Sequence, residues 1–313
     1  MRVIDREEVA RRLTYELCIP LVRQAMITLS AGQTRQLLRS IIPLADGHMF
    51  GIMPGALGAR AMFGAKLISI FPDNFSKGTP SHQGVVVLFD GENGAPVCIV
   101  HAGEITAIRT AAASAVASDA LARPESTRLA ILGYGEQAVT HARAMTRVRP
   151  ISDITVWGRD ADRAEAFADK VSAELGVPVS PCADVPTAVA KADIVCAVTN
   201  AREPILLGRW LRPGTHVNLV GSGHAGPVEV DNDLVVMSRF IADSREGVLA
   251  QGAEFLNARA VGLIDDSHVV GEIGQVLAGD LEGRQSADQI TVYKSLGHVV
   301  QDLAAAKALH EAT

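Results

Sequence analysis

The sequence predicts an α/β protein in which a central Rossmann-type parallel sheet is joined to a second, α+β domain. Two observations predict this fold class. From residue 128 onward, short apolar runs alternate with helical stretches, as they do in a parallel sheet covered on both faces. Before that point, the strand-like runs are separated by turns rich in glycine, proline and asparagine, which is typical of an antiparallel sheet.

In the first part of the chain, the sequence predicts helical stretches and three strands. Residues 7–29 have a helical pattern that Pro20 interrupts. Residues 104–122 form an alanine-rich helix, whose small side chains suit close packing and which is expected to lead into the parallel-sheet domain. The expected strands are 47–54, 65–71 and 84–90.

The second part predicts strands and helices in alternation. A helix is expected from about residue 137 and another over 161–175, which ends at Gly176, a typical residue after a helix C-terminus. A third, short helix is expected over 185–191. The expected strands cover residues 128–133, 153–160, 177–180, 193–199, 215–221 and 235–243.

Length and composition limit the function classes. The chain has 313 residues, which exceeds the common single-domain size, so two domains are expected. Its formal net charge is −6, it has no block of lysine and arginine, and only 4% of its residues are aromatic, so nucleic acid is not an expected partner. It begins without an apolar signal segment and has no run near the roughly 18 residues that span a bilayer, so we expect a cytoplasmic protein.

Cysteine and histidine spacing predicts no metal site. The four cysteines lie far apart without a C-x-x-C pair, and the nine histidines show no ligand spacing. We therefore expect reduced, mostly buried thiols and no bound metal ion.

The segment GYGEQA, residues 133–138, predicts a dinucleotide-binding turn. It follows an expected strand and opens an expected helix. Gly133 permits the tight turn, Gly135 lets the backbone approach a pyrophosphate, and Ala138 allows close contact between helix and strand. The N-terminus of the helix then offers N–H groups and a positive dipole end to the phosphates. The alternative is a glycine turn with a structural role only.

The next strand ends in Trp157, Gly158 and Arg159, where NAD-binding proteins carry an acidic residue. An acidic side chain there accepts hydrogen bonds from the ribose hydroxyls and repels a 2′-phosphate. Arg159 can instead pair with that phosphate, with help from Arg163 one turn on. The sequence therefore favours NADP(H) over NAD(H), and the alternative is that Arg159 is only a solvated surface residue.

Basic residues of the first domain form a second candidate group. Lys66 lies in the apolar segment AMFGAKLISIF, and a charge there has to reach water or an anion because burial without a partner is costly. Arg39, His82 and Arg109 lie in other segments, and each alone is as well explained by a structural or solvated role. Together, two guanidinium groups and an ammonium group suit a substrate carboxylate, which arginine binds with two hydrogen bonds.

Several separate segments, spread over nearly the whole chain, together form a recognisable pattern. They are MPG (53–55), Lys66, PSHQGVVVLFD (80–90), ITAIRTAAASAVA (105–117), LAILGYGEQAVTHA (129–142) and DQITVYKSLGHVVQDLAAA (288–306). In these segments the chain resembles the ornithine cyclodeaminase/μ-crystallin family. Members have an N-terminal substrate and dimerisation domain, completed by the C-terminal helix, and a central Rossmann domain. They use NAD(P)(H) and act on amino acids or on cyclic and acyclic imines.

The resemblance implies domains, partners and residue roles for this chain. The expected domains are residues 1–117 with 298–313 for substrate binding and dimerisation, and 118–297 for the dinucleotide, in a homodimer. Lys66 is implied to transfer a proton near the imine, with His82 and His224 as alternates. The implied substrate-binding residues are Arg39, Met53, Lys66 and Arg109. The implied cofactor-binding residues are Ser81, His82, Arg109, Thr110, Gly133, Gly135, Glu136, Gln137, Ala138, Arg159, Thr199, Val220 and Ser295.

One departure from the family decides between reactions. Ornithine cyclodeaminases carry G-A-D after a later strand of the Rossmann domain, and this aspartate is their general base. The matching residues here are Gly221, Ser222 and Gly223, followed by His224. Because no carboxylate stands at that position, the cyclodeaminase reaction is not favoured.

The favoured function is an NAD(P)H-dependent reductase that converts a ketimine or imino acid to an L-amino acid. Its substrate is expected to be Δ1-pyrroline-2-carboxylate or an open-chain imino acid such as iminosuccinate. The alternatives are an ornithine cyclodeaminase-type lyase with bound NAD, an amino-acid dehydrogenase, and a μ-crystallin-like protein that binds NADPH and a small ligand without turnover.

Overall fold

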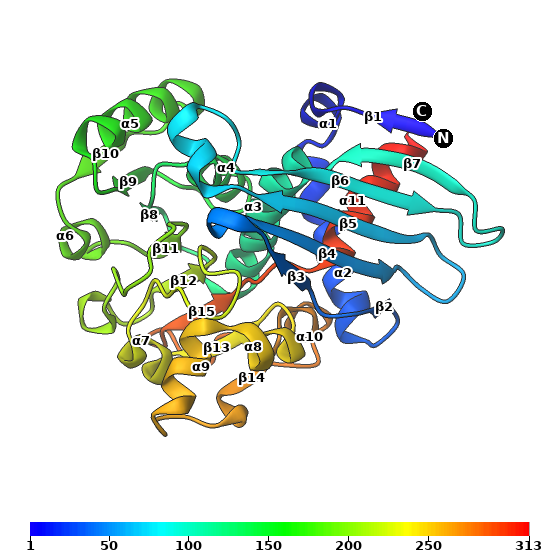
Figure 1. The fold of residues 1–313 in the computed structure, drawn as a ribbon. Helices are drawn as coiled ribbons and strands as arrows, with labels where there is room; N and C mark the ends of the chain where they lie inside the picture. The colour runs from blue at the N-terminus through cyan, green and yellow to red at the C-terminus, as the bar shows by residue number, and fades with distance from the viewer. Residues whose placement is uncertain (313) are drawn as a thin grey trace. The chain divides into compact units, whose positions relative to one another are not determined.

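The computed structural model describes residues 1–312, except for the side chains of residues 75 and 76. It divides into two compact units, Met1–Arg109 with His298–Thr313, and Thr110–Gly297 (Figure 1). No helix in the described chain is both long and apolar enough to cross a membrane.

The first unit is built on a sheet of seven strands within the described residues. The strand order is β1-β7-β6-β5-β4-β2, with β3 also on β4, and every pairing is antiparallel except that of β1 with β7. The strands are β1 (Arg2–Ile4), β2 (Arg35–Gln36), β3 (Ser40–Pro43), β4 (Met49–Ala56), β5 (Phe63–Ile70), β6 (His82–Phe89) and β7 (Pro96–His101).

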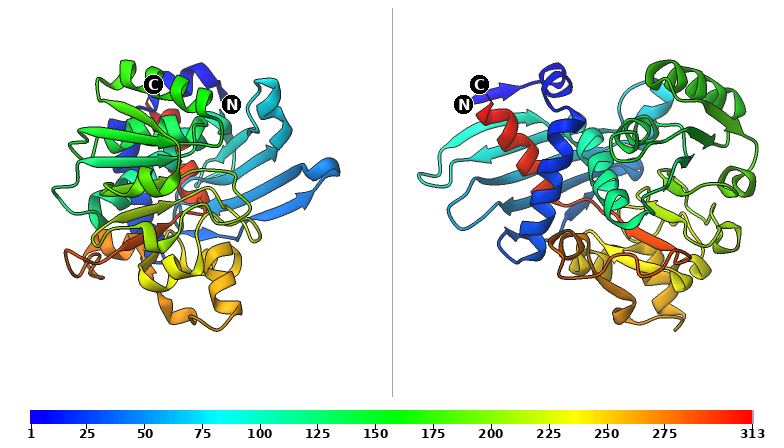
Figure 2. Two further views of the ribbon diagram at one scale, coloured as in Figure 1. Left: turned by 90° about the vertical axis from the view of Figure 1, so that its left-hand side faces the viewer. Right: turned by 180° about the vertical axis from the view of Figure 1, so that it is seen from behind.

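Two long helices, α2 (Tyr15–Ser30) and α11 (Val299–Glu311), pack against each other, and α11 also contacts β4, β5 and β6 (Figure 2). Side chains alternate along β5, so that Lys66 and Ile68 are buried whereas Leu67 between them is partly exposed. The other helical elements of the unit are α1 (Arg6–Arg12) and the short 3-10 helices η1 (Ala45–Gly47) and η2 (Pro72–Lys77).

The expected helix over residues 7–29 breaks at a different place from the one predicted. It consists of α1 and α2, which are separated at Leu13 and Thr14, and Pro20 lies inside α2. The side chain of Thr14 accepts a hydrogen bond from the backbone N–H of Leu17, so Thr14 is the N-cap of a new helix. The capping residue, and not the proline, therefore sets the boundary.

The second unit is a parallel sheet with helices around it, and the predicted fold class is confirmed. Its strand order over the described residues is β10-β9-β8-β11-β12-β15-β13-β14, and all these pairings are parallel. The order reverses between β8 and β11, and ligands of such sheets bind beyond the carboxyl ends of the strands at that point. The strands are β8 (Arg128–Leu132), β9 (Asp153–Trp157), β10 (Val179–Cys182), β11 (Ile194–Ala197), β12 (His216–Leu219), β13 (Arg239–Ala242), β14 (Val269–Glu272) and β15 (Thr291–Lys294).

Helix α3 (Ala102–Leu121) runs from the first unit into the second, as the alanine-rich pattern predicts. In the second unit, β14 and β15 were not expected from the sequence, and the described part of the first unit has seven strands where three were expected. The helical elements of the second unit are α4 (Glu136–Met145), α5 (Ala161–Leu175), α6 (Val185–Val189), η3 (Gly208–Trp210), α7 (Asn232–Met237), α8 (Arg245–Gln251), α9 (Ala253–Ala260), η4 (Asp266–His268) and α10 (Ile273–Ala278).

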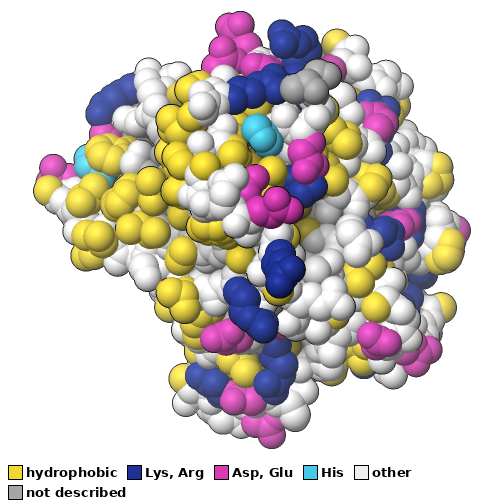
Figure 3. Space-filling model, turned by 90° about the vertical axis from the view of Figure 1, so that its right-hand side faces the viewer, with side chains coloured by type: hydrophobic (Ala, Val, Ile, Leu, Met, Phe, Trp, Pro, Cys, Tyr) yellow, Lys and Arg dark blue, Asp and Glu magenta, His cyan; other side chains and the backbone are white. Residues whose placement is uncertain are grey.

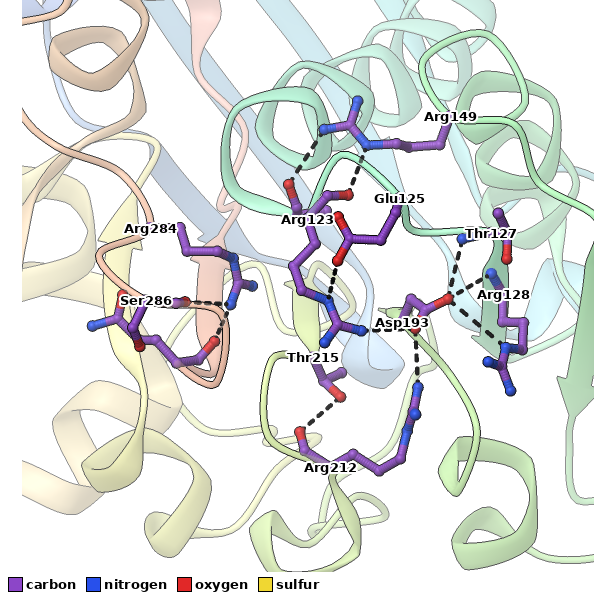
Figure 4. Close-up of polar contacts among 12 residues, drawn as sticks. Arg123, Glu125, Thr127, Arg128, Arg149, Asp193, Arg212, Thr215, Arg284 and Ser286 are labelled. Atoms are coloured by element: carbon purple, nitrogen blue, oxygen red, sulfur yellow. Dashed lines mark hydrogen bonds and ion pairs between the residues drawn. The ribbon is translucent and has the colours of Figure 1, made fainter.

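Asp193 joins the amino ends of β8 and β11 (Figure 4). It directly precedes β11, and its carboxylate accepts hydrogen bonds from the guanidinium groups of Arg123 at 3.0 Å and Arg212 at 2.9 Å. The backbone N–H groups of Thr127 and Arg128 donate to its other oxygen at 3.1 and 3.0 Å. This edge is opposite to the one where a ligand binds, so the network belongs to the stability of the sheet.

Replacing Asp193 with alanine is expected to destabilise the fold by about 3 kcal/mol, because two guanidinium groups and two N–H groups lose a partner that is 6% exposed. Burial alone raises the pKa of Asp193, but the N–H groups of Thr127 and Arg128 and the nearby arginines outweigh it and lower that pKa. The stabilisation is therefore present at neutral pH and lost as the pH falls through the lowered value. Urea unfolding checks this, with exposed Asp169→Ala as control; equal midpoints contradict it.

Candidate functional site

A buried group of charges lies in the first unit, between β5, α3 and α11. The Asp302 Oδ1 atom accepts hydrogen bonds from Lys66 Nζ and from Arg109 Nε, both at 3.0 Å. Gln301 Oε1 accepts a second bond from Arg109, at 2.9 Å. All four side chains are buried, with exposed fractions of 0 to 3%. We call these four residues the carboxylate-site cluster.

The fold fixes this cluster from three directions. Lys66 is in the middle of β5 and points to the side that α11 covers, and Arg109 comes from α3. Asp302 and Gln301 lie in the first turn of α11, whose N-cap His298 accepts a hydrogen bond from the N–H of Val300. The cluster is therefore held by regular structure and not by loops.

The charges of the cluster do not balance. Lys66 and Arg109 share one carboxylate, and Arg39 acts on Lys66 as a further cation. Burial lowers the pKa of Lys66 to about 7, although Asp302 acts to raise it. Burial acts to raise the pKa of Asp302, but Arg109 and Lys66 outweigh it and lower that pKa. The excess of positive charge suits an anion such as a carboxylate, and the pKa of Lys66 suits a group that gives and takes a proton near neutral pH.

The other sequence-predicted residues of this unit lie around the cluster or at its edge. Met53 is buried and pairs with Lys66 across the β4–β5 ladder. Arg39 is half-buried. His82 is exposed at the start of β6, and its Nδ1 atom lies 2.9 Å from the Ser81 hydroxyl oxygen. The two histidines proposed as alternate proton carriers, His82 and His224, are in different units.

The GYGEQA turn of the second unit leaves its backbone open at the start of α4. Gly133 has φ +119°, which L side chains rarely adopt, and a Cβ there would lie 3.0 Å from the Val198 oxygen. Gly135 is the N-cap of α4, no side chain caps that helix end, and a Cβ at Gly135 would meet nothing within 4 Å. Ala138 is fully buried. The backbone of this turn is therefore open to a ligand at the N-terminus of a ten-residue helix.

An aromatic ring lies against the end of β9, a contact that the sequence did not indicate. The Tyr134 ring lies against Gly158 so closely that a Cβ there would be 2.0 Å from its Cδ1 and Cε1 atoms. The Arg163 guanidinium lies over the same ring, 4.7 Å from its centroid. Arg159 is exposed directly before Asp160, the N-cap of α5. Two arginines therefore lie beside the position expected for the adenosine ribose.

The remaining predicted cofactor contacts of the second unit lie in the loops after β11, β12 and β15 and in the helices α3 and α4. Thr199 and Val220 are half-buried, and Thr110 in α3 is 8% exposed. Ser295 is 2% exposed, and its hydroxyl has no hydrogen-bond partner among the described residues. A buried hydroxyl of this kind fits a ligand with polar groups, such as a nicotinamide carboxamide. Glu136 and Gln137 lie in the first turn of α4.

In the segment after β12, one side chain is buried in a hydrogen-bond network and the next two residues are partly exposed. Ser222 is 1% exposed and bonds to Glu254 and Lys294, so it does not face a ligand. Gly223 and His224 are partly exposed. The buried residues that sequence reasoning missed are Gln301, Asp302, Glu229, Glu254 and Lys294. The available signal was a charged or amide residue inside an apolar segment, as in VVQDLAAA and TVYKSLG.

The chain is similar to known proteins over nearly its whole length. The chain is 34% identical to the ketimine reductase mu-crystallin of Mus musculus over 98% of this chain and 96% of that protein. The structure of Thermococcus litoralis Δ1-pyrroline-2-carboxylate reductase in complex with NADH and L-proline is similar, with a TM-score of 0.96 and 33% identity over 99% of this chain and 97% of that chain.

The iminosuccinate reductase of Paracoccus denitrificans in complex with NAD⁺ is also similar, with a TM-score of 0.92 and 28% identity over 99% of this chain and 95% of that chain. The model of the ornithine cyclodeaminase/mu-crystallin family matches residues 2–313. The chain therefore belongs to the ornithine cyclodeaminase/mu-crystallin family.

Proposed function

We propose that the protein is an NAD(P)H-dependent oxidoreductase that reduces the C=N bond of a ketimine or imino acid to give an L-amino acid. The observation that carries this proposal is the carboxylate-site cluster, in which a buried lysine and arginine outnumber their one carboxylate partner. Relatives with matching chains are a ketimine reductase and a Δ1-pyrroline-2-carboxylate reductase that was solved with NADH and L-proline.

Three residues of the cluster have defined tasks in this reaction. Arg109 donates from Nε to Asp302 and from Nη1 to Gln301, and its remaining guanidinium N–H groups are available to the substrate carboxylate, with Arg39 as a second cation nearby. Lys66 gives the proton that keeps the imine nitrogen charged, since a protonated imine is the better electrophile. Asp302 keeps Lys66 and Arg109 at fixed positions. When bound, the reduced nicotinamide supplies the hydride.

The dinucleotide is held by the second unit. The GYGEQA turn and the N-terminus of α4 receive the pyrophosphate, and the Ser295 hydroxyl is available to the nicotinamide. Arg159 and Arg163 favour a 2′-phosphate, so NADP(H) is the expected cofactor, although similar structures hold NADH or NAD⁺.

Reversing the charge of Arg159 with Arg159→Asp is expected to move the preference from NADPH toward NADH by about 10- to 100-fold, because a charge-assisted hydrogen bond is replaced by repulsion. The ratio of kcat/KM for the two cofactors measures this. Lys170→Asp, an equal charge reversal at another exposed position of the adjoining helix α5, is the matched control. If Arg159→Asp leaves the ratio unchanged, Arg159 does not contact the 2′-phosphate.

The second candidate function, ornithine cyclodeamination, is disfavoured because Gly223 stands where that reaction needs a carboxylate base. Amino-acid dehydrogenation is the same chemistry in reverse. A ligand-binding role without turnover does not require a lysine that gives and takes a proton near neutral pH, whereas burial lowers the pKa of Lys66 to about 7.

The proposal is tested by following NADPH absorbance with Δ1-pyrroline-2-carboxylate, iminosuccinate, and a panel of 2-oxo acids with amines. Oxidation of NADPH with one of the imines is the expected result. Ammonia release from L-ornithine without net cofactor change indicates the lyase, and tight NADPH binding with no turnover of any substrate indicates the binding protein.

A homodimer is part of the proposal. On the side of the sheet opposite to Lys66, β5 and β6 present Leu67, Val85 and Val87, which are only partly buried, and the stacked pair Phe63 and Phe89. Hydrophobic side chains also gather on one part of the surface that Figure 3 draws. Such a face suits a partner of the same kind. The molar mass measured by light scattering after size-exclusion chromatography distinguishes a dimer from a monomer.

A further inference from the structure

One buried carboxylate ties together the loops that follow β11 and β12. Glu229 Oε1 accepts hydrogen bonds from the backbone N–H of Thr199 at 2.6 Å and from its hydroxyl at 2.7 Å. Glu229 Oε2 accepts one from the backbone N–H of Gly221 at 2.7 Å. Thr199 and Gly221 each lie two residues beyond the end of neighbouring parallel strands. Glu229 therefore joins two strand ends at the edge of the sheet where ligands bind.

Glu229 is itself fixed by the backbone. The N–H groups of Ile205 and Leu206 donate to its carbonyl oxygen at 2.9 and 3.0 Å, and its own N–H donates to Glu254 Oε1 at 3.2 Å. Its exposed fraction is 0%. The position of the carboxylate is thus fixed, and the three groups bonded to it, the N–H and hydroxyl of Thr199 and the N–H of Gly221, all act as donors.

A second layer of buried polar groups supports the same loops. Lys294 Nζ lies 2.8 Å from Glu254 Oε2 and donates to the Ser222 hydroxyl at 2.5 Å. Ser222 in turn donates to Glu254. Glu254 on α9 and Lys294 on β15 are the charged groups that act on Glu229, so two carboxylates share one buried cation. Burial raises the pKa of Glu229 to about 7, while the bonds from Thr199 and the charge of Lys294 act to lower it.

We propose that Glu229 is a positioning residue that holds the ends of β11 and β12 in the form that binds the nicotinamide half of the dinucleotide. This rests on the proposed function only in requiring that a dinucleotide binds at this edge. The backbone of Gly221 has to come close to Glu229, since a Cβ there would lie 2.6 Å from Glu229 Oε1 and 2.0 Å from the Thr199 oxygen. Thr199 and Val220, both expected to contact the cofactor, lie on the two loops so joined.

The test is Glu229→Gln, with ligand affinity as the readout. Glutamine keeps one acceptor oxygen but sets an amide N–H₂ group against a backbone N–H, so one loop loses its tie. The Kd of NADPH is expected to rise by about 10- to 100-fold. The Kd of 2′-phospho-ADP-ribose, which lacks the nicotinamide, is expected to stay unchanged. Both are measured by titration calorimetry on the full chain.

The matched control is Asp231→Asn, which makes the same chemical change two residues along the chain. Asp231 caps α7 by accepting from the Leu234 N–H at 3.1 Å, and asparagine caps equally well, so both affinities should stay as in the wild type.

The pH dependence of binding gives a second readout of Glu229. In the wild type, the affinity for NADPH should weaken as the pH falls through about 7, because burial raises the pKa of Glu229 to that value and the protonated carboxyl accepts fewer hydrogen bonds. The affinity for 2′-phospho-ADP-ribose should not show this loss, and in Glu229→Gln the difference between the two ligands should vanish.

An unchanged Kd of NADPH in Glu229→Gln overturns the positioning role. An equal rise in the Kd of NADPH and of 2′-phospho-ADP-ribose also overturns it, because it indicates a general loss of structure. If Glu229→Gln does not fold, Gly221→Ala displaces the same carboxylate and should likewise raise the Kd of NADPH without changing that of 2′-phospho-ADP-ribose. Wild-type protein that binds neither ligand overturns the proposed function and this role together. Wild-type protein that binds NADPH but reduces no imine overturns the imine activity alone.

Discussion

Lys66→Ala is expected to lower kcat/KM for imine reduction by about 100- to 10,000-fold, the range usual for loss of a general acid. Lys66 is buried next to Arg109 and Asp302, and burial lowers its pKa to about 7. The variant removes the proposed proton donor and one of the cations that hold the substrate carboxylate. Because the GYGEQA turn and the N-terminus of α4, which are proposed to receive the pyrophosphate, lie in the other unit, the Kd of NADPH should stay nearly unchanged.

The fold is expected to survive this change, since Asp302 keeps its bond to Arg109 in the absence of Lys66. Lys77→Ala is the matched control, because Lys77 is an exposed lysine of the same unit whose partner is Asp73. Steady-state kinetics and NADPH titration are needed side by side. Retained activity in Lys66→Ala shows that another group, of which His82 is the first to test, carries the proton.

The pH profile gives a second readout of Lys66. If the protonated amine is required, kcat/KM falls as the pH rises above about 7, since that is where the lysine loses its proton. In Lys66→Ala this limb of the profile should disappear.

Local sequence patterns were the basis of the parts of the fold that were predicted correctly. Alternation of apolar runs and helices predicted the parallel sheet, and most strand positions from β8 to β13 agree within a few residues. The GYGEQA turn is a continuous segment whose expected function depends on its own backbone, so it could be proposed from the sequence alone. Lys66 was singled out because a charge inside an apolar strand needs a partner.

The partners themselves were not predictable, because they come from distant parts of the chain. Asp302 is 236 residues from Lys66 and lies in a helix that reads as ordinary apolar core. Glu229 follows a loop with three glycines and a proline, and nothing local indicates that its side chain turns back to Thr199 and Gly221. Tertiary packing decides such pairings, whereas residue spacing decides turns and caps.

Asp302→Asn is expected to cost about 3 to 5 kcal/mol of folding stability at neutral pH, since it leaves Lys66 and Arg109 buried without a carboxylate. The pKa of Asp302 is lowered in the fold, so its stabilising contribution is complete above the ordinary carboxyl range and is lost as the pH falls through the lowered value. Urea unfolding at neutral pH measures the loss. The control is Glu311→Gln, because Glu311 lies in the same helix, is exposed and forms an ion pair with Lys307.

The same variant separates a structural role of Asp302 from an effect on proton transfer. Asp302 acts to raise the pKa of Lys66, so its removal should lower that pKa further and move the falling limb of the kcat/KM profile to lower pH. Titration of the substrate imine is common to wild type and variant and cannot cause a difference between them. A loss of stability with an unmoved limb means that Asp302 only holds the fold. A shifted limb means that the α11 carboxylate keeps Lys66 charged, so that the lysine remains a proton donor despite its burial.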